Sequence, residues 1–215
     1  MRKKILIITG IVVLVAAAAV GGFFIWQRLQ TPKDTPKQTE TVLDHSKDYG
    51  ACKLLDMSTI KSALGEVAND LQEPKDMGIV QNKAQGEGVD DLSSDSQYCV
   101  YAFKPGGTLE NGYNSGEAFM IEWIVYTNDS GPKALIEQIK ANNVTEPVDE
   151  LSATAFYSAN TASKGPDATY SFRLETFTDK TSVRYIIRQP AESASFTAES
   201  GKSALVQLAK QAKQP

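Results

Sequence analysis

The pattern of hydrophobic positions begins with one long apolar run, residues 5–26, which contains no charged residue. A helix of this length would measure about 33 Å, enough to cross a hydrocarbon core of about 30 Å. Arg2, Lys3 and Lys4 precede the run, so the positive-inside bias predicts a cytoplasmic N-terminus. We therefore expect a single-pass helix in the plasma membrane with the rest of the chain outside. A cleaved signal peptide is the alternative, because a basic start followed by an apolar stretch also fits that pattern.

A polar segment follows the apolar run. Between residues 30 and 47 there are two prolines and several charges, and only Val42 and Leu43 are aliphatic. Such a segment cannot bury enough apolar surface to fold alone, which predicts a flexible stalk. The expected organisation is therefore a cytoplasmic tip with a transmembrane helix (1–27), a stalk (28–47) and an extracytoplasmic α+β domain (48–215).

The hydrophobic pattern of the domain alternates between two periods. Apolar residues three and four positions apart predict helices beginning near Asp56, after Asp129 or Ser130, and near Thr197. Strand-forming residues predict strands over 97–103 and 118–126, and a hairpin over 168–175 and 183–188. Segment 118–126 is apolar on both faces apart from Glu122, so we expect it in the middle of the sheet.

These elements predict an α+β fold: a mainly antiparallel twisted sheet packed with helices. In the hairpin, one face is apolar and the other is largely polar, so one face of the sheet should carry the core.

Charge is unevenly placed along the chain. All 26 acidic residues follow the apolar run, whereas four of the 22 basic residues precede it or adjoin its end. The exported part therefore has a formal charge of about −8, which argues against nucleic acid or anionic lipid as its main partner.

Cys52 and Cys99 are the two cysteines of the chain. In an exported domain an even pair of cysteines is first interpreted as a disulfide. A bridge that closes about 48 residues would stabilise the fold by about 4 kcal/mol in the chain-entropy model. We therefore predict a structural role for both residues.

The residues that could carry catalysis are few. The single histidine, His45, lies in the predicted stalk, which leaves no Ser-His-Asp triad and no histidine-based zinc site in the domain. A Ser-x-x-Lys pattern occurs at Ser58 and Lys61, and Asp90 with Asp95 forms a candidate carboxylate pair. We predict no catalytic residue, no metal and no cofactor, and keep a small extracytoplasmic hydrolase using one of these pairs as the alternative.

Two groups of charged residues are candidates for binding. The acidic group could hold calcium, but its spacing does not match an EF-hand loop, and a solvated acidic loop is the favoured interpretation. The basic group lies on the polar face of the predicted hairpin and could meet an anion or an acidic partner, with pairing to Glu175 as the alternative. The acidic group is Asp90, Asp91 and Asp95, with Glu87 nearby, and the basic group is Arg173, Arg184 and Arg188.

Four short motifs carry a resemblance to a known family: CysLysLeuLeuAsp at 52–56, AlaLeuGly at 63–65, TyrCysValTyr at 98–101 and AlaLeuValGlnLeuAlaLys at 204–210. The chain resembles the uncharacterised actinobacterial surface lipoproteins with a Cys-x-Leu-Leu, Leu-Gly and Cys-x-Tyr pattern. It is also similar to the sensor ectodomains of mycobacterial receptor Ser/Thr kinases. The resemblance implies a PsbP-like sandwich, pairing of Cys52 with Cys99, and binding instead of catalysis. The chain departs from both groups, because it has no lipid-modified cysteine and no kinase domain.

The sequence therefore predicts a membrane-anchored extracytoplasmic binding or sensing module that is not an enzyme. Residues 5–26 would provide the membrane contact, and the partner would be an envelope protein, a peptide or a small ligand. We expect the binding surface on the irregular segments 70–97 and 105–116, because loops on a rigid scaffold usually carry binding.

Overall fold

The computed structural model describes residues 43–44, 47–82, 92–105, 117–142, 144–161 and 168–213. The chain divides into two units, 1–39 and 40–215, and all described residues belong to the second. The predicted transmembrane run, residues 5–26, lies outside the described residues.

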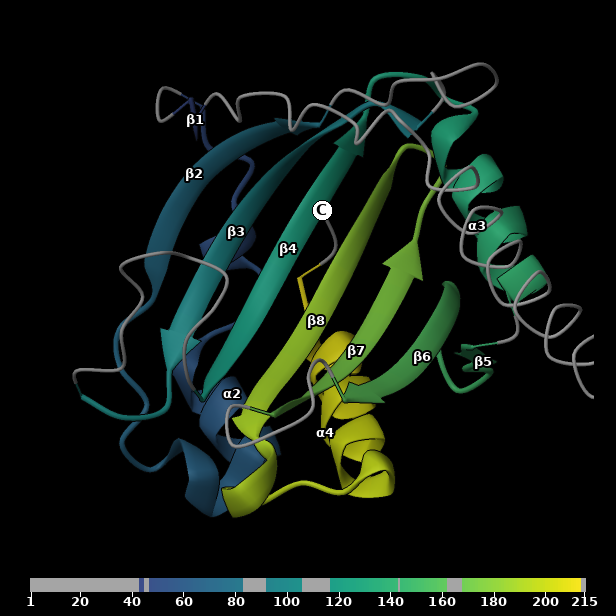
Figure 1. Cartoon of the computed structure of the whole chain (residues 1–215). Coiled ribbons are helices and arrows are strands. Elements are labelled where there is room, and N and C mark those ends of the chain that lie inside the picture. The colour runs from purple at the N-terminus through teal and green to yellow at the C-terminus, as the bar shows by residue number, and fades with distance from the viewer. Residues whose placement is uncertain are drawn as a thin grey trace, which may run out of the picture. The chain divides into compact units, whose positions relative to one another are not determined.

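The described domain is built on one antiparallel sheet of eight strands in the order β1-β2-β3-β4-β8-β7-β6-β5 (Figure 1). The strands are β1 (Leu43–Asp44), β2 (Lys75–Asn82), β3 (Ser94–Ala102), β4 (Ala118–Tyr126), β5 (Glu146–Pro147), β6 (Thr154–Thr161), β7 (Thr169–Phe177) and β8 (Thr181–Pro190). β4 lies inside the sheet between β3 and β8, which agrees with its two apolar faces. β7 and β8 form the expected hairpin.

Helices α2 (Met57–Leu64) and α4 (Ala198–Gln211) lie together on one side of the sheet, behind the strands in Figure 1. Short 3₁₀ helices are η1 (Ala51–Lys53), η2 (Gly65–Ala68) and η4 (Ala191–Ser193). The core lies between this face and the two helices, because alternate strand residues meet the apolar sides of α2 and α4. Its most buried members include Tyr101, Phe119, Ile121, Leu174, Ile187, Ile60, Leu205 and Leu208.

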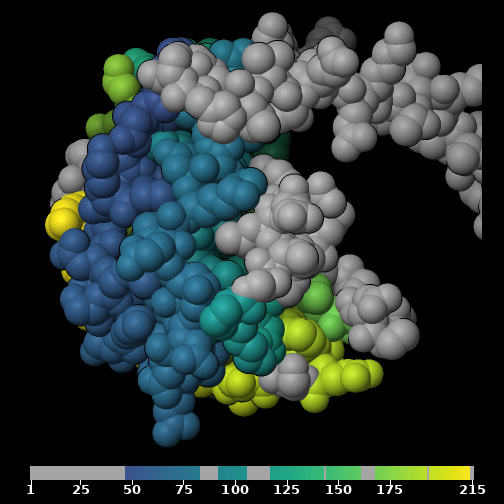
Figure 2. Space-filling model, turned by 90° about the vertical axis from the view of Figure 1, so that its left-hand side faces the viewer, coloured from purple at the N-terminus to yellow at the C-terminus, as the bar shows by residue number. Residues whose placement is uncertain are grey.

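A disulfide joins η1 to β3, as predicted. The sulfur atoms of Cys52 and Cys99 are 2.04 Å apart, and the Cα atoms are 5.1 Å apart. Hydrogen bonds from Gln97 support the same junction, because its amide nitrogen donates to Asp48 at 3.1 Å and to Asp76 at 2.7 Å. Figure 2 looks at this edge of the domain, where residues that precede β3 in the chain form much of the surface.

The predicted fold class is wrong, because the helices and the sheet do not form the expected sandwich. Helix α3 (Gly131–Asn142) buries only Gly131 and Pro132, and the apolar side chains that predicted its packing are only half-buried. Figure 1 shows α3 away from α2 and α4. We call the face opposite α2 and α4 the helix-free face, because no described helix packs on it. It carries charged residues along β7 and β8 beside a small apolar cluster that includes Val100 and Met120.

The predicted membrane helix, residues 5–26, lies outside the part of the chain whose helices the structure describes. Among the described residues, no helix is long and apolar enough to cross a membrane. The three α-helices of the described ranges have 8, 12 and 14 residues, whereas a bilayer needs about 20.

Candidate functional site

Helix α4 begins with a reciprocal cap. The backbone N–H of Ser200 donates to the Thr197 hydroxyl at 3.2 Å, and the backbone N–H of Thr197 donates to the Ser200 hydroxyl at 2.9 Å. This arrangement satisfies two donors that a helix start otherwise leaves open. The cap therefore fixes where α4 begins, and with it the direction of every side chain on the helix.

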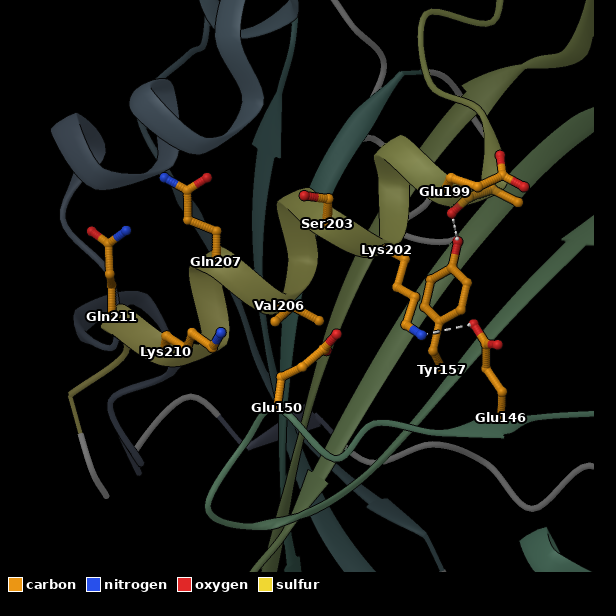
Figure 3. Close-up of a pocket in the computed structure, with 11 residues that line it drawn as sticks. Glu146, Glu150, Tyr157, Glu199, Lys202, Ser203, Val206, Gln207, Lys210 and Gln211 are labelled. Carbon is orange, nitrogen blue, oxygen red and sulfur yellow. Dashed lines mark hydrogen bonds and ion pairs between the residues drawn. The ribbon is translucent and has the colours of Figure 1, made fainter.

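One side of α4 is buried in the core and another borders a groove. Gly201, Leu205 and Leu208 are buried against the sheet. Lys202 and Lys210 are each four residues from Val206, a spacing that puts each lysine next to Val206 on the helix surface. Figure 3 shows both side chains extending toward the chain segment that contains Glu146 and Glu150.

The groove consists of two adjoining cavities. The larger has a volume of about 690 Å³ and lies between α4 and the residues Glu146, Glu150 and Tyr157. The smaller has a volume of about 320 Å³ and is also lined by apolar residues such as Leu151. Glu150 and Lys210 line both cavities, so the two spaces adjoin. We call this combined space the α4 groove.

Two contacts hold one end of the α4 groove. The ammonium group of Lys202 lies 3.3 Å from a carboxylate oxygen of Glu146, and the Tyr157 hydroxyl donates to the carbonyl oxygen of Ala198 at 2.6 Å. Burial raises the pKa of Tyr157 to about 12, and the negative charges of Glu146 and Glu199 add to the effect. Tyr157 is therefore a neutral donor that ties β6 to α4.

The place where the two cavities meet has two charged residues, Glu150 and Lys210. Within the described part of the chain, Glu150 and Lys210 take part in no salt bridge, and both are exposed. Buried Val206 lies between Lys202 and Lys210 on the helix. The groove thus offers a negative side chain, a positive side chain and apolar lining residues, which suits a ligand that has both polar and apolar parts.

Of the predicted binding residues, Arg184 is the most deeply placed. It lies on the helix-free face between two acids, since the strand register pairs it with Glu122 on β4 and with Glu175 on β7. Its guanidinium nitrogens are 3.1 Å from a Glu122 oxygen and 2.9 Å from a Glu175 oxygen. The Tyr98 hydroxyl donates to Glu122 at 2.5 Å, and the Ser182 hydroxyl donates to Glu175 at 3.0 Å. Residues of four strands therefore form one polar array across the sheet.

The opposite charges of this array stabilise one another. Burial alone would lower the pKa of Arg184, but the negative charges of Glu175 and Glu122 outweigh burial and raise it. Arg184 remains a cation, and its role in this arrangement is to neutralise two buried carboxylates. The alternative that we considered from the sequence, pairing with Glu175, therefore holds for Arg184.

Arg173 and Arg188 lie on the same face as Arg184, in neighbouring rows of the sheet. Arg173 is opposite Ile186 on β8, and Arg188 is opposite Ser171 on β7. All three arginines are half-buried. The structure thus brings the predicted basic residues onto one face, but only Arg184 belongs to the polar array.

The acidic candidates are not brought together. Asp90 and Asp91 lie outside the described residues, and the Asp95 carboxylate accepts a hydrogen bond from the Tyr49 hydroxyl at 2.9 Å. Within the described ranges, no group of three or more histidine, cysteine, aspartate or glutamate residues could hold a metal ion.

Ser58 and Lys61 lie on α2 and are both exposed. The Lys61 ammonium group donates to the carbonyl oxygen of Asn69 at 3.4 Å, and in the described part of the chain no hydrogen bond joins it to Ser58. A nucleophilic serine needs a base within hydrogen-bonding reach, and this geometry does not provide one.

Sequence reasoning missed the α4 groove. It treated α4 only as an apolar stripe and looked for binding in segments 70–97 and 105–116, parts of which lie outside the described residues. A usable signal was present, because Lys202, Val206 and Lys210 recur every four residues beside the apolar stripe. Nothing in the sequence indicated that Glu146 and Glu150 would face them.

No protein-family model matches the chain, and no curated protein is similar to it. A crystal structure from Bacteroides thetaiotaomicron is similar to part of the chain, with a TM-score of 0.35 and 14% sequence identity. The similar region covers 59% of this chain and 42% of that chain, so this chain spans less than half of the structure it matches. A likeness this distant supports no inference about function, which must come from the site itself.

Proposed function

We propose that this protein is an extracytoplasmic binding module that holds an extended polypeptide segment in the α4 groove and catalyses no reaction. The observation that carries the proposal is the pair of adjoining cavities along α4, with Glu150 and Lys210 lining both and forming no salt bridge within the described part of the chain.

The dimensions of the groove favour an extended peptide. α4 has 14 residues and is therefore about 21 Å long, which matches about six residues of an extended chain. An extended peptide presents polar groups at every residue and side chains on both sides. A groove with separate charged and apolar positions can contact the polar and apolar side chains of such a ligand along its length.

The disulfide supports an extracytoplasmic location. Disulfides persist in oxidising compartments and are rare in the reducing cytosol. The bridge between Cys52 and Cys99 therefore suits a domain that works outside the cytoplasm. The resemblance to actinobacterial surface lipoproteins remains a prediction that agrees with this location.

The hydrolase alternative has a direct test. A fluorophosphonate probe labels activated serines, so the full-length protein and its Ser58→Ala variant should give the same labelling if the protein is a binding module. Covalent labelling that is lost in Ser58→Ala would favour the hydrolase.

The binding proposal is tested by selecting peptides from a random library on the full-length protein and measuring their affinity for charge-reversal variants. Lys210→Glu and Glu150→Lys should each weaken binding about tenfold, since a charge-assisted contact of about 1.4 kcal/mol would be lost. Lys133→Glu is the matched control, because Lys133 is an exposed lysine on α3, outside the groove. Peptides that bind all three variants as tightly as the unchanged protein would contradict a ligand in the α4 groove.

A further inference from the structure

Two rows of side chains on the helix-free face contain arginine and no acidic residue. They lie next to the row that contains Arg184, and they run across the sheet through the cross-strand pairs. The first row is Ser158, Arg173, Ile186, Met120 and Val100, and the second is Asn160, Ser171, Arg188, Ala118 and Ala102. In both rows the charged side chains are therefore basic, although the chain as a whole is acidic.

The two carboxylates of the neighbouring row, those of Glu122 and Glu175, are already engaged. One oxygen of Glu122 accepts from Tyr98 and the other from Arg184. The first oxygen of Glu175 contacts both Arg184 and Ser182. Within the described residues no salt bridge reaches Arg173, so its half-buried charge is not neutralised there.

A second, independent observation comes from Ser158. Ser158 is 5% exposed, and its hydroxyl group is buried without a hydrogen-bond partner. The register places Ser158 on β6 directly opposite Arg173 on β7. A buried hydroxyl without a partner is costly, so a hydroxyl donor left open beside an arginine indicates a missing acceptor.

We propose that Ser158 and Arg173 form a binding site for an anionic group, either a carboxylate or a phosphate. Ser158 and Arg173 are directly opposite each other on adjacent strands, so both side chains can reach one bound anion. A guanidinium group donates two parallel hydrogen bonds to such an anion, and the Ser158 hydroxyl supplies a further donor. This site lies on the opposite face of the sheet from α4, so it does not depend on the proposed peptide groove.

The test is a titration of the full-length protein with inorganic phosphate and, separately, with succinate, at an ionic strength held constant with chloride. We expect saturable binding in calorimetry and a rise in Tm with at least one of the two anions. The anion that binds more tightly, phosphate or succinate, shows whether the site prefers a phosphate or a carboxylate group.

Two variants make the result specific. Arg173→Gln should weaken anion binding about tenfold, whereas Lys133→Gln, an exposed lysine on α3, should leave it unchanged. Ser158→Ala should weaken binding several-fold without lowering the Tm of the anion-free protein, because it removes a hydroxyl that has no partner.

Three results would overturn the proposal. The first is no saturable binding of either anion. The second is equal binding to the unchanged protein, Arg173→Gln and Ser158→Ala. The third is a lower Tm of anion-free Ser158→Ala, which would mean that the hydroxyl already has a partner within the protein.

Discussion

Arg184 is the residue on which the charge balance of the helix-free face depends. Its side chain is 22% exposed, while those of Glu122 and Glu175 are 6% and 3% exposed. Two carboxylates this deeply buried would repel each other and would lose their hydration without compensation. A single guanidinium group between them offsets both effects, which explains why the three residues share one row of the sheet.

Replacing Arg184 should therefore destabilise the fold strongly. Arg184→Met leaves two buried charges unpaired, and we expect the free energy of unfolding to fall by about 3 kcal/mol. Urea denaturation followed by circular dichroism measures the change. The triple variant that adds Glu122→Gln and Glu175→Gln should recover a large part of the loss, because it removes the unpaired charges. Equal stability of the single and triple variants would contradict this account.

Asp48 makes the stability of the fold sensitive to acid. A hydrogen bond from Lys53, together with bonds from Gln97 and Gly50, lowers the pKa of Asp48 to about 2 from 3.8. A depressed folded-state pKa means that this contribution is fully present above about pH 4 and is lost as the pH falls toward 2.

The prediction is a change in the acid limb of the stability curve. The difference in free energy of unfolding between the unchanged protein and Asp48→Asn should be positive near neutral pH and should shrink between about pH 4 and pH 2. Lys53→Gln should flatten the same limb, because it removes the largest cause of the shift. If the curve of Asp48→Asn runs parallel to that of the unchanged protein, the contacts of Asp48 contribute nothing.

At the scale of elements, the packing of α4 on β7 requires a glycine. A Cβ atom at Gly201 would lie 2.9 Å from Cγ of Phe172, closer than carbon atoms normally approach. Gly201→Ala gains helix propensity of up to about 1 kcal/mol but should lose more through this overlap, because overpacking typically costs about 1–3 kcal/mol.

The measurement is thermal unfolding of Gly201→Ala, with Ser203→Ala as the control at an exposed position of the same helix. We expect a lower Tm for the first and a small change for the second. In the Phe172→Ala background, which removes the Cγ and Cδ atoms that the new Cβ would meet, Gly201→Ala should be tolerated better. A Gly201→Ala protein at least as stable as the original would show that the ring moves aside freely.

The elements themselves were largely predictable, because local patterns specify them. The alternation of Tyr170, Phe172 and Leu174 with polar residues indicated β7, and the two apolar faces of segment 118–126 indicated an inner strand. The position of α3 was not predictable from its pattern. Its apolar side chains have helical spacing, but whether they meet a partner depends on where the sheet lies.

At the scale of the whole molecule, the sites depend on register and on long-range packing. Glu122, Glu175 and Arg184 belong to three strands, and their pairing follows only once the strand order is known. The α4 groove likewise joins Glu150 to Lys210 across 60 residues of chain. The sequence predicted the disulfide and the shared face of the arginines. No local pattern predicts which distant segment faces α4.

The whole molecule thus offers different chemistry on its two sides. One side of the sheet carries α2, α4 and the groove, and the other carries the polar array and the proposed anion site. If the α4 groove is the binding surface, ligand binding should change amide exchange on one side of the sheet and not on both.

Hydrogen exchange of the full-length protein with and without a selected peptide tests the central claim most directly. A peptide in the α4 groove should slow amide exchange in residues 144–157 and in α4, and should leave α2 unchanged. Saturating peptide that leaves α4 and residues 144–157 unprotected, or that protects the helix-free strands instead, would contradict the account.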